Sequence, residues 1–155
     1  MQMFHILFLC THNRCRSILC EAIVNAKADG LMRASSAGSA PQGQVHPMTL
    51  KYLGARGYPT GGLESKSWDR FRDDLPDLVV TVCDAAAAEA CPVWLGVTEK
   101  VHWSLKDPSK LSSPSEQEAA FHQIIDEIEG QVPQWMKRAV EVRRVSDKTK
   151  KTHRD

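Results

Sequence analysis

Short apolar runs alternate with amphipathic segments along the first half of the chain. Residues 4–9, FHILFL, form an apolar run that predicts a strand, and apolar positions recur at helical spacing in residues 17–28. A second, weaker strand is predicted at residues 32–38, where a turn-rich segment follows. The next helix is predicted at residues 46–57, with a proline at its start and Gly57 at its end.

The second half continues the same alternation. Residues 68–75 are predicted to form one or two helical turns, and residues 77–83, DLVVTVC, give the strongest strand signal. Their almost continuous apolar run is typical of a central strand that is buried on both faces. A last short strand is predicted at residues 99–105, and a long amphipathic helix at residues 114–144, in which Pro133 is expected to cause a kink or break.

Strands that alternate with helices predict an α/β fold. We expect a three-layer α/β/α arrangement around a four-stranded parallel sheet. The length of 155 residues and the 42% share of hydrophobic residues are sufficient for one domain with a real core. That domain is expected to span residues 1–142, and the basic stretch at residues 143–155, which is poor in apolar anchors, is expected to be a tail.

Charge and cysteine content narrow the class of protein. The formal net charge of +1 provides no overall field for nucleic acid or a membrane, so neither is expected as a partner. The N-terminal apolar segment is too short for a membrane span and leads into Arg14 and Arg16 rather than a cleavage site, so a cytoplasmic protein is expected. Five cysteines, an odd number, favour reactive or buried thiols over a disulfide framework. The histidines show no metal-ligand spacing, and neither a metal nor another cofactor is expected.

The stretch CTHNRCRS, residues 10–17, carries the most specific chemical signal. Cys10 follows the first predicted strand, and ligands gather at the carboxyl ends of the strands in a parallel sheet. If residues 11–16 curl around a point, their N–H groups form a nest for a tetrahedral oxyanion, supported by the N-terminus of the following helix. This site should lower the pKa of Cys10 and make it a nucleophile, while Arg16 binds the oxyanion with two donors.

A buried cysteine and a solvated arginine, each without a task, are the alternative interpretation of this stretch. The combination of a cysteine, five residues and then Arg-Ser, placed between a strand and a helix, favours the catalytic interpretation.

The same stretch resembles the phosphate loop of the low-molecular-weight protein tyrosine phosphatases and of the arsenate reductases built on the same fold. The likeness continues through SSAGS, VHP, VVTVCD, CPVW and HWSLKDP, and so covers nearly the whole predicted domain. It implies a low-molecular-weight phosphatase-like fold in which Cys10 is the nucleophile and Arg16 binds the oxyanion. It also implies that Asn13 holds the loop in shape and that Ser17 supports the thiolate. The oxyanion-binding residues are then Thr11, His12, Asn13, Arg14, Cys15, Arg16 and Ser17.

Asp107 precedes a proline in the loop after the last predicted strand. Without the resemblance it would be an ordinary exposed turn residue. In both families an Asp-Pro at this place supplies the general acid that protonates the departing oxygen. The phosphatases commonly continue with a tyrosine that helps to bind an aryl substrate, whereas Ser109 follows here, which weakens the phosphatase interpretation.

Two further cysteines distinguish the reductases from the phosphatases. Cys83 ends the central predicted strand, close to where Cys10 ends the first, and Cys91 follows eight positions later. Reduction of arsenate requires two electrons, which thiols supply when they form a disulfide. The resemblance to the thioredoxin-coupled arsenate reductases implies a relay in which Cys83 attacks Cys10 and Cys91 then attacks Cys83. The spacing of the last two is one residue longer here than in those reductases, and two buried structural cysteines are the alternative.

The segment between these two cysteines, residues 84–90, consists almost entirely of helix formers and is predicted to be helical in the reduced protein. Eight residues of α-helix rise about 12 Å, whereas a disulfide needs its two Cα atoms about 4.4–6.8 Å apart. The helix and a Cys83–Cys91 disulfide therefore exclude each other, and we expect oxidation to unwind the segment.

Lys66 is a candidate for an internal cation. Related reductases can hold a potassium ion near the loop through Asn, Glu, Ser and Asp side chains, and Asn13, Glu21 and Ser36 match three of them. The sequence ESKS stands where the Asp is expected. The ammonium group of Lys66 could replace the ion, and a solvated surface lysine is the equal alternative.

Together these features predict a thiol-dependent arsenate reductase that acts in arsenic detoxification and retains some phosphatase activity. Its substrate is expected to be arsenate or a phosphate-like oxyanion, and its reductant thioredoxin, or glutaredoxin with glutathione. Two alternatives remain open at this point. One is a low-molecular-weight protein tyrosine phosphatase, and the other is a non-catalytic thiol redox sensor or oxyanion-binding module, which would give Asp107 no task.

Overall fold

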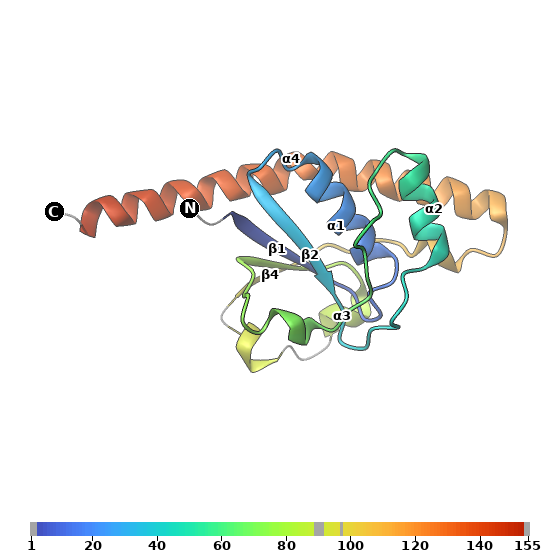
Figure 1. Ribbon diagram of the computed structural model, residues 1–155, viewed down its shortest axis with the longest axis horizontal. Coiled ribbons are helices and arrows are strands. Elements are labelled where there is room, and N and C mark those ends of the chain that lie inside the picture. The colour runs from blue at the N-terminus through green and yellow to red at the C-terminus, as the bar shows by residue number, and fades with distance from the viewer. Residues whose placement is uncertain (1–2, 89–91, 97, 154–155) are drawn as a thin grey trace.

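One parallel sheet organises the protein (Figure 1). The computed structural model describes residues 3–88, 92–96 and 98–153. The sheet has the strand order β2-β1-β3-β4, and the strands are β1 Phe4–Leu9, β2 Met32–Ala37, β3 Leu78–Thr81 and β4 Glu99–His102. The predicted four-stranded parallel sheet is confirmed, and β3, the strand with the strongest apolar run, lies inside the sheet with all four residues buried.

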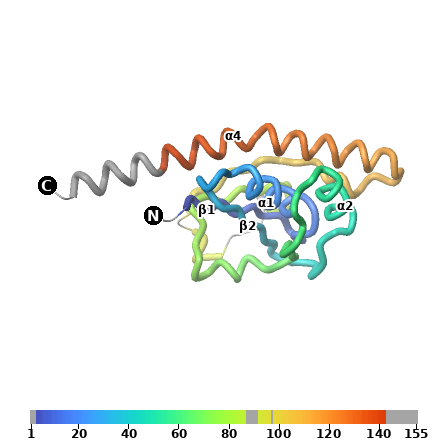
Figure 2. The backbone as a smooth tube through the Cα atoms, turned by 45° about the horizontal axis from the view of Figure 1, so that its top comes forward, coloured from blue at the N-terminus to red at the C-terminus, as the bar shows by residue number. Residues whose placement is uncertain are grey.

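Helices connect the strands as the alternating pattern predicts. They are α1 Arg16–Lys27, α2 Pro47–Ala55, α3 Asp84–Ala88 and α4 Pro114–His153, with the short 3₁₀ helices η1 Trp68–Phe71, η2 Val93–Leu95 and η3 Pro108–Lys110. Figure 2 shows α4 running along the body of the protein beside α1, and these two helices pack against each other. Together they cover one face of the sheet.

The side chains of β1 alternate between two apolar layers, because successive residues of a strand point to opposite faces. Its even-numbered residues belong to the large core beneath α1 and α4. Leu7 and Leu9 point to the other face, where they pack with Phe71 of η1 and Leu95 of η2. The third layer of the predicted α/β/α arrangement is thus built by short 3₁₀ segments near the sheet.

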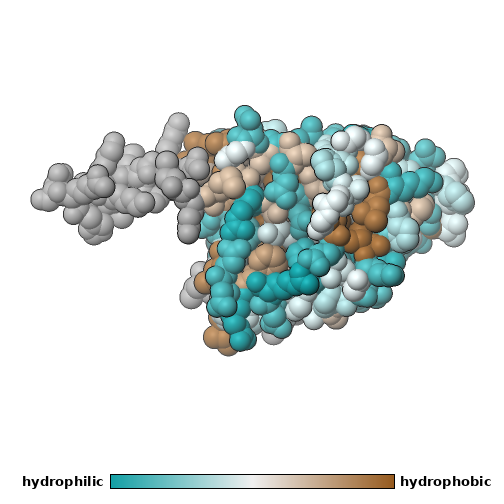
Figure 3. Space-filling view, viewed as in Figure 1, coloured by the Kyte–Doolittle hydropathy of each residue, from teal (hydrophilic) through white to brown (hydrophobic). Residues whose placement is uncertain are grey.

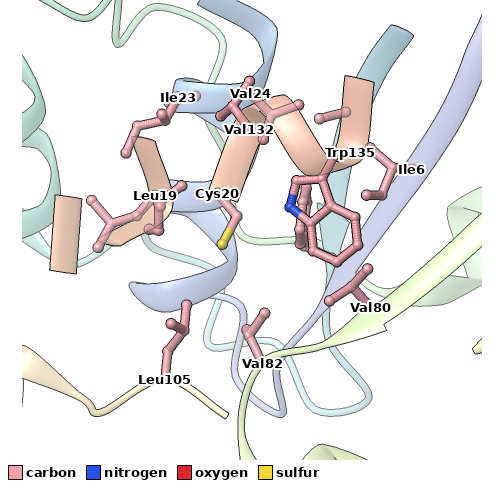
Figure 4. Close-up of a cluster of buried hydrophobic side chains, with 14 of the residues drawn as sticks. Ile6, Leu19, Cys20, Ile23, Val24, Val80, Val82, Leu105, Val132 and Trp135 are labelled. Atoms are coloured by element: carbon pink, nitrogen blue, oxygen red, sulfur yellow. The ribbon is translucent and has the colours of Figure 1, made fainter. Parts of the chain in front are cut away.

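Cys20 lies inside the large core, in α1. Figure 4 shows its sulfur among apolar side chains that include Ile6, Val80 and Trp135. The side chain is completely buried, and burial raises the pKa of its thiol. Cys20 is therefore a packing residue at neutral pH.

The long C-terminal helix departs from the prediction at Pro133. A proline removes one helical hydrogen bond and crowds the carbonyl four residues earlier, so a kink or break was expected. The structure instead has one continuous helix from Pro114 to His153 that includes residues 143–153 of the expected tail (Figure 1). Val132 and Trp135, on either side of the proline, are both buried in the core, and this packing holds the two halves of the helix in line.

The described surface is mostly polar on the side that Figure 3 shows, where hydrophilic side chains predominate and apolar groups form separate patches. Within the described residues, no helix is both long enough and apolar enough to cross a lipid bilayer.

Candidate active site

The candidate site is the loop from Cys10 to Ser17, which joins the carboxyl end of β1 to α1. The predicted order of strand, loop and helix is present, and α1 begins at Arg16. The Cys10 N–H donates to the carbonyl of Ala37 at 3.2 Å, which ties the start of the loop to β2. Cys10 is buried, with 6% of its surface exposed, at the edge of the sheet where β3 also ends.

The segment 40–46 wraps around the outside of this loop. Its backbone N–H groups donate to the carbonyl oxygens of Thr11, His12 and Arg14 at 2.9, 3.1 and 2.9 Å. No peptide bond of the described chain is cis, and the C=O and N–H of a trans peptide point in opposite directions. The N–H groups that follow these carbonyls therefore point to the inner side of the loop, as a nest for an oxyanion requires.

Asn13 occupies the position that shapes the loop. Its φ of 48° lies in the left-handed region, which asparagine tolerates better than most residues. Its side-chain N–H₂ donates to the Ser17 hydroxyl at 2.8 Å, and its side-chain oxygen accepts from the Lys66 backbone N–H at 2.8 Å. The side chain of Asn13 thus connects the middle of the loop to its end at Ser17 and to the neighbouring segment at Lys66.

Gly38 permits the close approach of β2 to the loop. A Cβ atom at this position would lie 2.4 Å from the carbonyl oxygen of Thr11 and 2.8 Å from that of Cys10. Both contacts are with backbone atoms, so a larger residue would displace the loop. The sequence pattern identified Gly38 only as the end of a strand; its steric role depends on a contact between distant segments.

Arg16 and Asp107 meet beside the loop. One nitrogen of the Arg16 guanidinium donates to the Leu105 carbonyl at 3.1 Å, and the other lies 3.8 Å from Oδ2 of Asp107. The two side chains are only 17% and 18% exposed. The other carboxylate oxygen of Asp107 accepts from the backbone N–H and the hydroxyl of Ser109 at 3.0 and 2.6 Å. Asp107 therefore turns one oxygen toward the place where Arg16 would bind an oxyanion.

The thiols of Cys83 and Cys10 act on each other at the same edge of the sheet. This interaction, more than any other, lowers the pKa of Cys83, to about 5. The backbone N–H of Ala86 donates to the Cys83 sulfur at 3.4 Å, and the hydroxyl of Thr11 lies 3.8 Å from it. Cys83 is therefore the sulfur that carries a negative charge in this arrangement.

The pKa of Cys10 is raised, contrary to the sequence-based expectation. The interaction with the Cys83 thiol is the largest cause, followed by burial and by the charge on that neighbour. Arg16 and the backbone N–H of His12 act in the opposite direction. Because a charge on one thiol disfavours a charge on the other, the pair holds one proton, and Cys10 would become the thiolate if this proton moved to Cys83.

We expect the two thiols to react with an alkylating agent in different pH ranges. Only the thiolate reacts, so a pKa of about 5 predicts that labelling of Cys83 is constant at neutral pH and declines as the pH falls through about 5. Labelling of Cys10 should need alkaline pH, and should shift toward lower pH in Cys83→Ala because the main cause of the raised pKa is removed. Iodoacetamide labelling followed by peptide mass spectrometry measures both profiles. Faster labelling of Cys10 than of Cys83 at pH 7 would contradict this assignment.

Lys66 lies beside the loop as a partly buried cation. Its Nζ is 3.3 Å from a carboxylate oxygen of Glu21 and donates to the Glu64 carbonyl at 3.2 Å. The same Glu21 oxygen accepts from the Ser36 hydroxyl at 2.9 Å. The side chains of Lys66 and Glu21 are only 10% and 12% exposed, which favours an internal ammonium over a solvated surface lysine.

This arrangement predicts how the protein responds to potassium. The Lys66 ammonium already neutralises Glu21, so we expect potassium to raise neither the Tm nor the activity of the wild type. In Lys66→Asp, two carboxylates would face each other, and potassium should raise the Tm by ligand linkage. Thermal unfolding in potassium chloride and in choline chloride at equal ionic strength provides the comparison. A rise in the wild-type Tm that is specific for potassium would show that the ammonium does not replace an ion.

The remaining cysteines have different surroundings. Cys15 is buried, and burial raises the pKa of its thiol to about 12, so it is protonated at neutral pH. Cys91 lies outside the described residues, and its place beside Cys83 stays a prediction. Among the described residues, no three His, Cys, Asp or Glu side chains are grouped so that they could hold a metal ion.

Comparison with known proteins places this geometry in a family. The model of the low molecular weight phosphotyrosine protein phosphatases matches residues 5–148. The arsenate reductase of Halalkalibacterium halodurans is 35% identical over 124 residues, which are 79% of this chain and 88% of that protein.

Two solved structures are similar over most of this chain. The arsenate reductase of Archaeoglobus fulgidus has a TM-score of 0.68 at 27% identity, over 85% of this chain and 98% of that one. A thioredoxin-dependent arsenate reductase of Corynebacterium glutamicum has a TM-score of 0.67 at 26% identity, over 90% of this chain and 63% of that longer one.

Proposed function

Because this chain belongs to the low molecular weight phosphotyrosine protein phosphatase family, we propose that it reduces arsenate to arsenite with Cys10 as the nucleophile. Cys10 and Cys83 follow the paired ends of β1 and β3, and the effect of each thiol on the pKa of the other is the main support for this proposal. A phosphatase needs one thiol, since water can hydrolyse a phosphocysteine. A two-electron reduction by thiols requires a second ionisable thiol near the first, because the two thiols must form a disulfide. The similarity to arsenate reductases points in the same direction.

The first step forms a bond between sulfur and arsenic. The inner N–H groups of the loop and the guanidinium of Arg16 bind arsenate and stabilise its negative charge. The Cys10 sulfur displaces a hydroxyl group of the protonated arsenate, and this hydroxyl takes a second proton from Asp107 and leaves as water. The closeness of Asp107 to Arg16 supports this role, because the departing oxygen would lie between them.

The second step transfers the electrons. The Cys83 sulfur attacks the Cys10 sulfur, so that a disulfide forms and the bond between sulfur and arsenic breaks. The electron pair of that bond stays on arsenic, which is thereby reduced from As(V) to As(III) and leaves as arsenite. Two thiols have then been oxidised to one disulfide, which balances the two electrons.

The third step renews Cys10. Cys91 attacks Cys83, Cys10 leaves as a thiolate, and the new Cys83–Cys91 disulfide takes two electrons from a dithiol such as thioredoxin, or from glutaredoxin with glutathione. The segment after Cys83 forms the helix α3 over Asp84–Ala88, and the last two residues of the predicted helix, 89 and 90, lie outside the described residues together with Cys91. A helix continued as far as Cys91 would keep the two cysteines too far apart for a disulfide, so this step would require α3 to unwind.

An assay of arsenite production tests the proposed function. The purified protein is given arsenate with thioredoxin and thioredoxin reductase, or with glutaredoxin and glutathione, and hydrolysis of an aryl phosphate is measured in parallel. We expect arsenite with one of the two reductants and slow hydrolysis of the phosphate ester. Rapid ester hydrolysis without arsenite would instead support a tyrosine phosphatase, the second candidate, which the same loop, Arg16 and Asp107 could serve. No turnover in either assay would favour a non-catalytic thiol module.

A further inference from the structure

Asp84 is the residue directly after Cys83, and its carboxylate is bound by side chains at and after the end of β4. Its Oδ1 atom lies 3.0 Å from Nε2 of His102 and accepts from the hydroxyl of Ser104 at 3.1 Å. The side chain of Asp84 is 85% exposed, so it contributes little by packing. Its contacts instead connect the first turn of α3 to the end of β4.

His102 is itself fixed on both ring nitrogens. Its Nδ1 lies 2.8 Å from the hydroxyl of Thr81, the residue opposite it in the pairing of β3 with β4. A carboxylate can only accept, so Nε2 of His102 donates to Asp84, and Nδ1 is within hydrogen-bond distance of the Thr81 hydroxyl. The imidazole is thus a support of defined orientation at the edge of the sheet.

The loop that follows His102 also contacts the loop from Cys10 to Ser17, through Arg16. Between Ser104 and Asp107, the backbone of Leu105 donates to Val82 at 3.1 Å and accepts from Arg16 at 3.1 Å. One short segment therefore holds the first turn of α3 on one side and the oxyanion-binding arginine on the other.

The first turn of α3 in turn determines the surroundings of the Cys83 sulfur. The N–H of Ala86, two residues after Asp84, donates to this sulfur at 3.4 Å. An N–H in the first turn of a helix has no partner within the helix, so its bond to sulfur depends on where the turn is held. If the turn moves away from β4, Cys83 loses this donor.

We propose that Asp84 is a positioning residue, clamped by His102 and Ser104, that holds the first turn of α3 in place and thereby keeps Cys83 against Cys10. This proposal rests on the proposed function, in which Cys83 attacks Cys10 before α3 unwinds. An exposed contact between a carboxylate and an imidazole contributes little stability, and a helix as short as α3 is marginal without tertiary contacts. The clamp is therefore strong enough to place the sulfur and weak enough to release it for the last step.

Hydrogen exchange of the Ala86 amide in the reduced protein tests the clamp without arsenate. In Asp84→Ala we expect this amide to exchange roughly 3- to 10-fold faster, because two hydrogen bonds to an exposed carboxylate are lost. Asp84→Asn keeps a carbonyl oxygen as an acceptor and should fall between wild type and Asp84→Ala. Ser104→Ala, which removes one donor at the surface, should have a smaller effect in the same direction. Asp126→Ala is the matched control, since Asp126 is also exposed and pairs with Arg56 far from α3.

Two functional measurements complete the test. In Asp84→Ala the pH profile of Cys83 labelling should move to higher pH, because the Ala86 donor is lost, and arsenite release in a single turnover should slow several-fold. Unchanged exchange at Ala86 together with an unchanged labelling profile in Asp84→Ala would overturn the clamp. If exchange and labelling respond as expected but the wild type releases no arsenite, the clamp stands and the proposed reductase function is wrong.

Discussion

Cys10→Ser is expected to abolish both arsenite formation and aryl phosphate hydrolysis, with a loss on the order of 10⁴-fold or more. Both reactions begin with an attack by the atom at this position. In the proposed mechanism the thiol of Cys10 becomes a thiolate when its proton moves to Cys83, whereas a serine hydroxyl ionises far less readily than a thiol. Steady-state assays of arsenite and of the released aryl alcohol measure the two losses.

A binding measurement separates this chemical loss from damage to the loop. The nest consists of backbone N–H groups and Arg16, so Cys10→Ser and Cys10→Ala should still bind arsenate or sulfate, seen as a rise in Tm with the oxyanion. Activity of Cys10→Ser above a few per cent of wild type in either assay would show that the nucleophile is another residue.

Cys83→Ala is expected to separate the two activities. Arsenite release requires a second sulfur that attacks Cys10 and so breaks the bond between sulfur and arsenic. The amount of arsenite released in a single turnover should therefore fall below detection. Ester hydrolysis needs only the nest, Cys10 and Asp107, and should continue, because water rather than a thiol cleaves the phosphocysteine. Loss of the Cys83 thiolate also removes the main cause that raises the pKa of Cys10, so hydrolysis at neutral pH should increase.

Cys83→Ser is the control for the cavity that Cys83→Ala leaves in place of the sulfur. Its hydroxyl is close in size to the thiol and can keep the contact with Thr11, yet it cannot form a disulfide. Both variants should therefore fail to release arsenite while hydrolysing the ester. Equal loss of both activities in these variants, with the folded structure retained, would argue against the relay.

Local patterns in the sequence were sufficient for the architecture and for the position of the site. The apolar run of residues 4–9, the following loop and the helix after it all lie within about thirty residues, so periodicity and loop chemistry predict them directly. The continuous apolar run at residues 77–83 placed β3 inside the sheet for the same reason. The neighbourhood of Cys10 and Cys83 followed from these two strands, because parallel strands end at the same edge of a sheet.

Only the tertiary structure decided how the parts of the site act on one another. The negative charge of the thiol pair is placed on Cys83 mainly by its interaction with Cys10, and further by the N–H of Ala86 in α3 and by Thr11. The continuity of α4 through Pro133 depends on packing in the core. The clamp of Asp84 by His102 depends on the register of β3 with β4. The sequence by itself therefore determined the strands, the order of the helices and the identity of the candidate nucleophile. Protonation and positioning were decided by contacts between residues far apart in the chain, whose strength depends on burial and distance in the folded protein and leaves no local pattern.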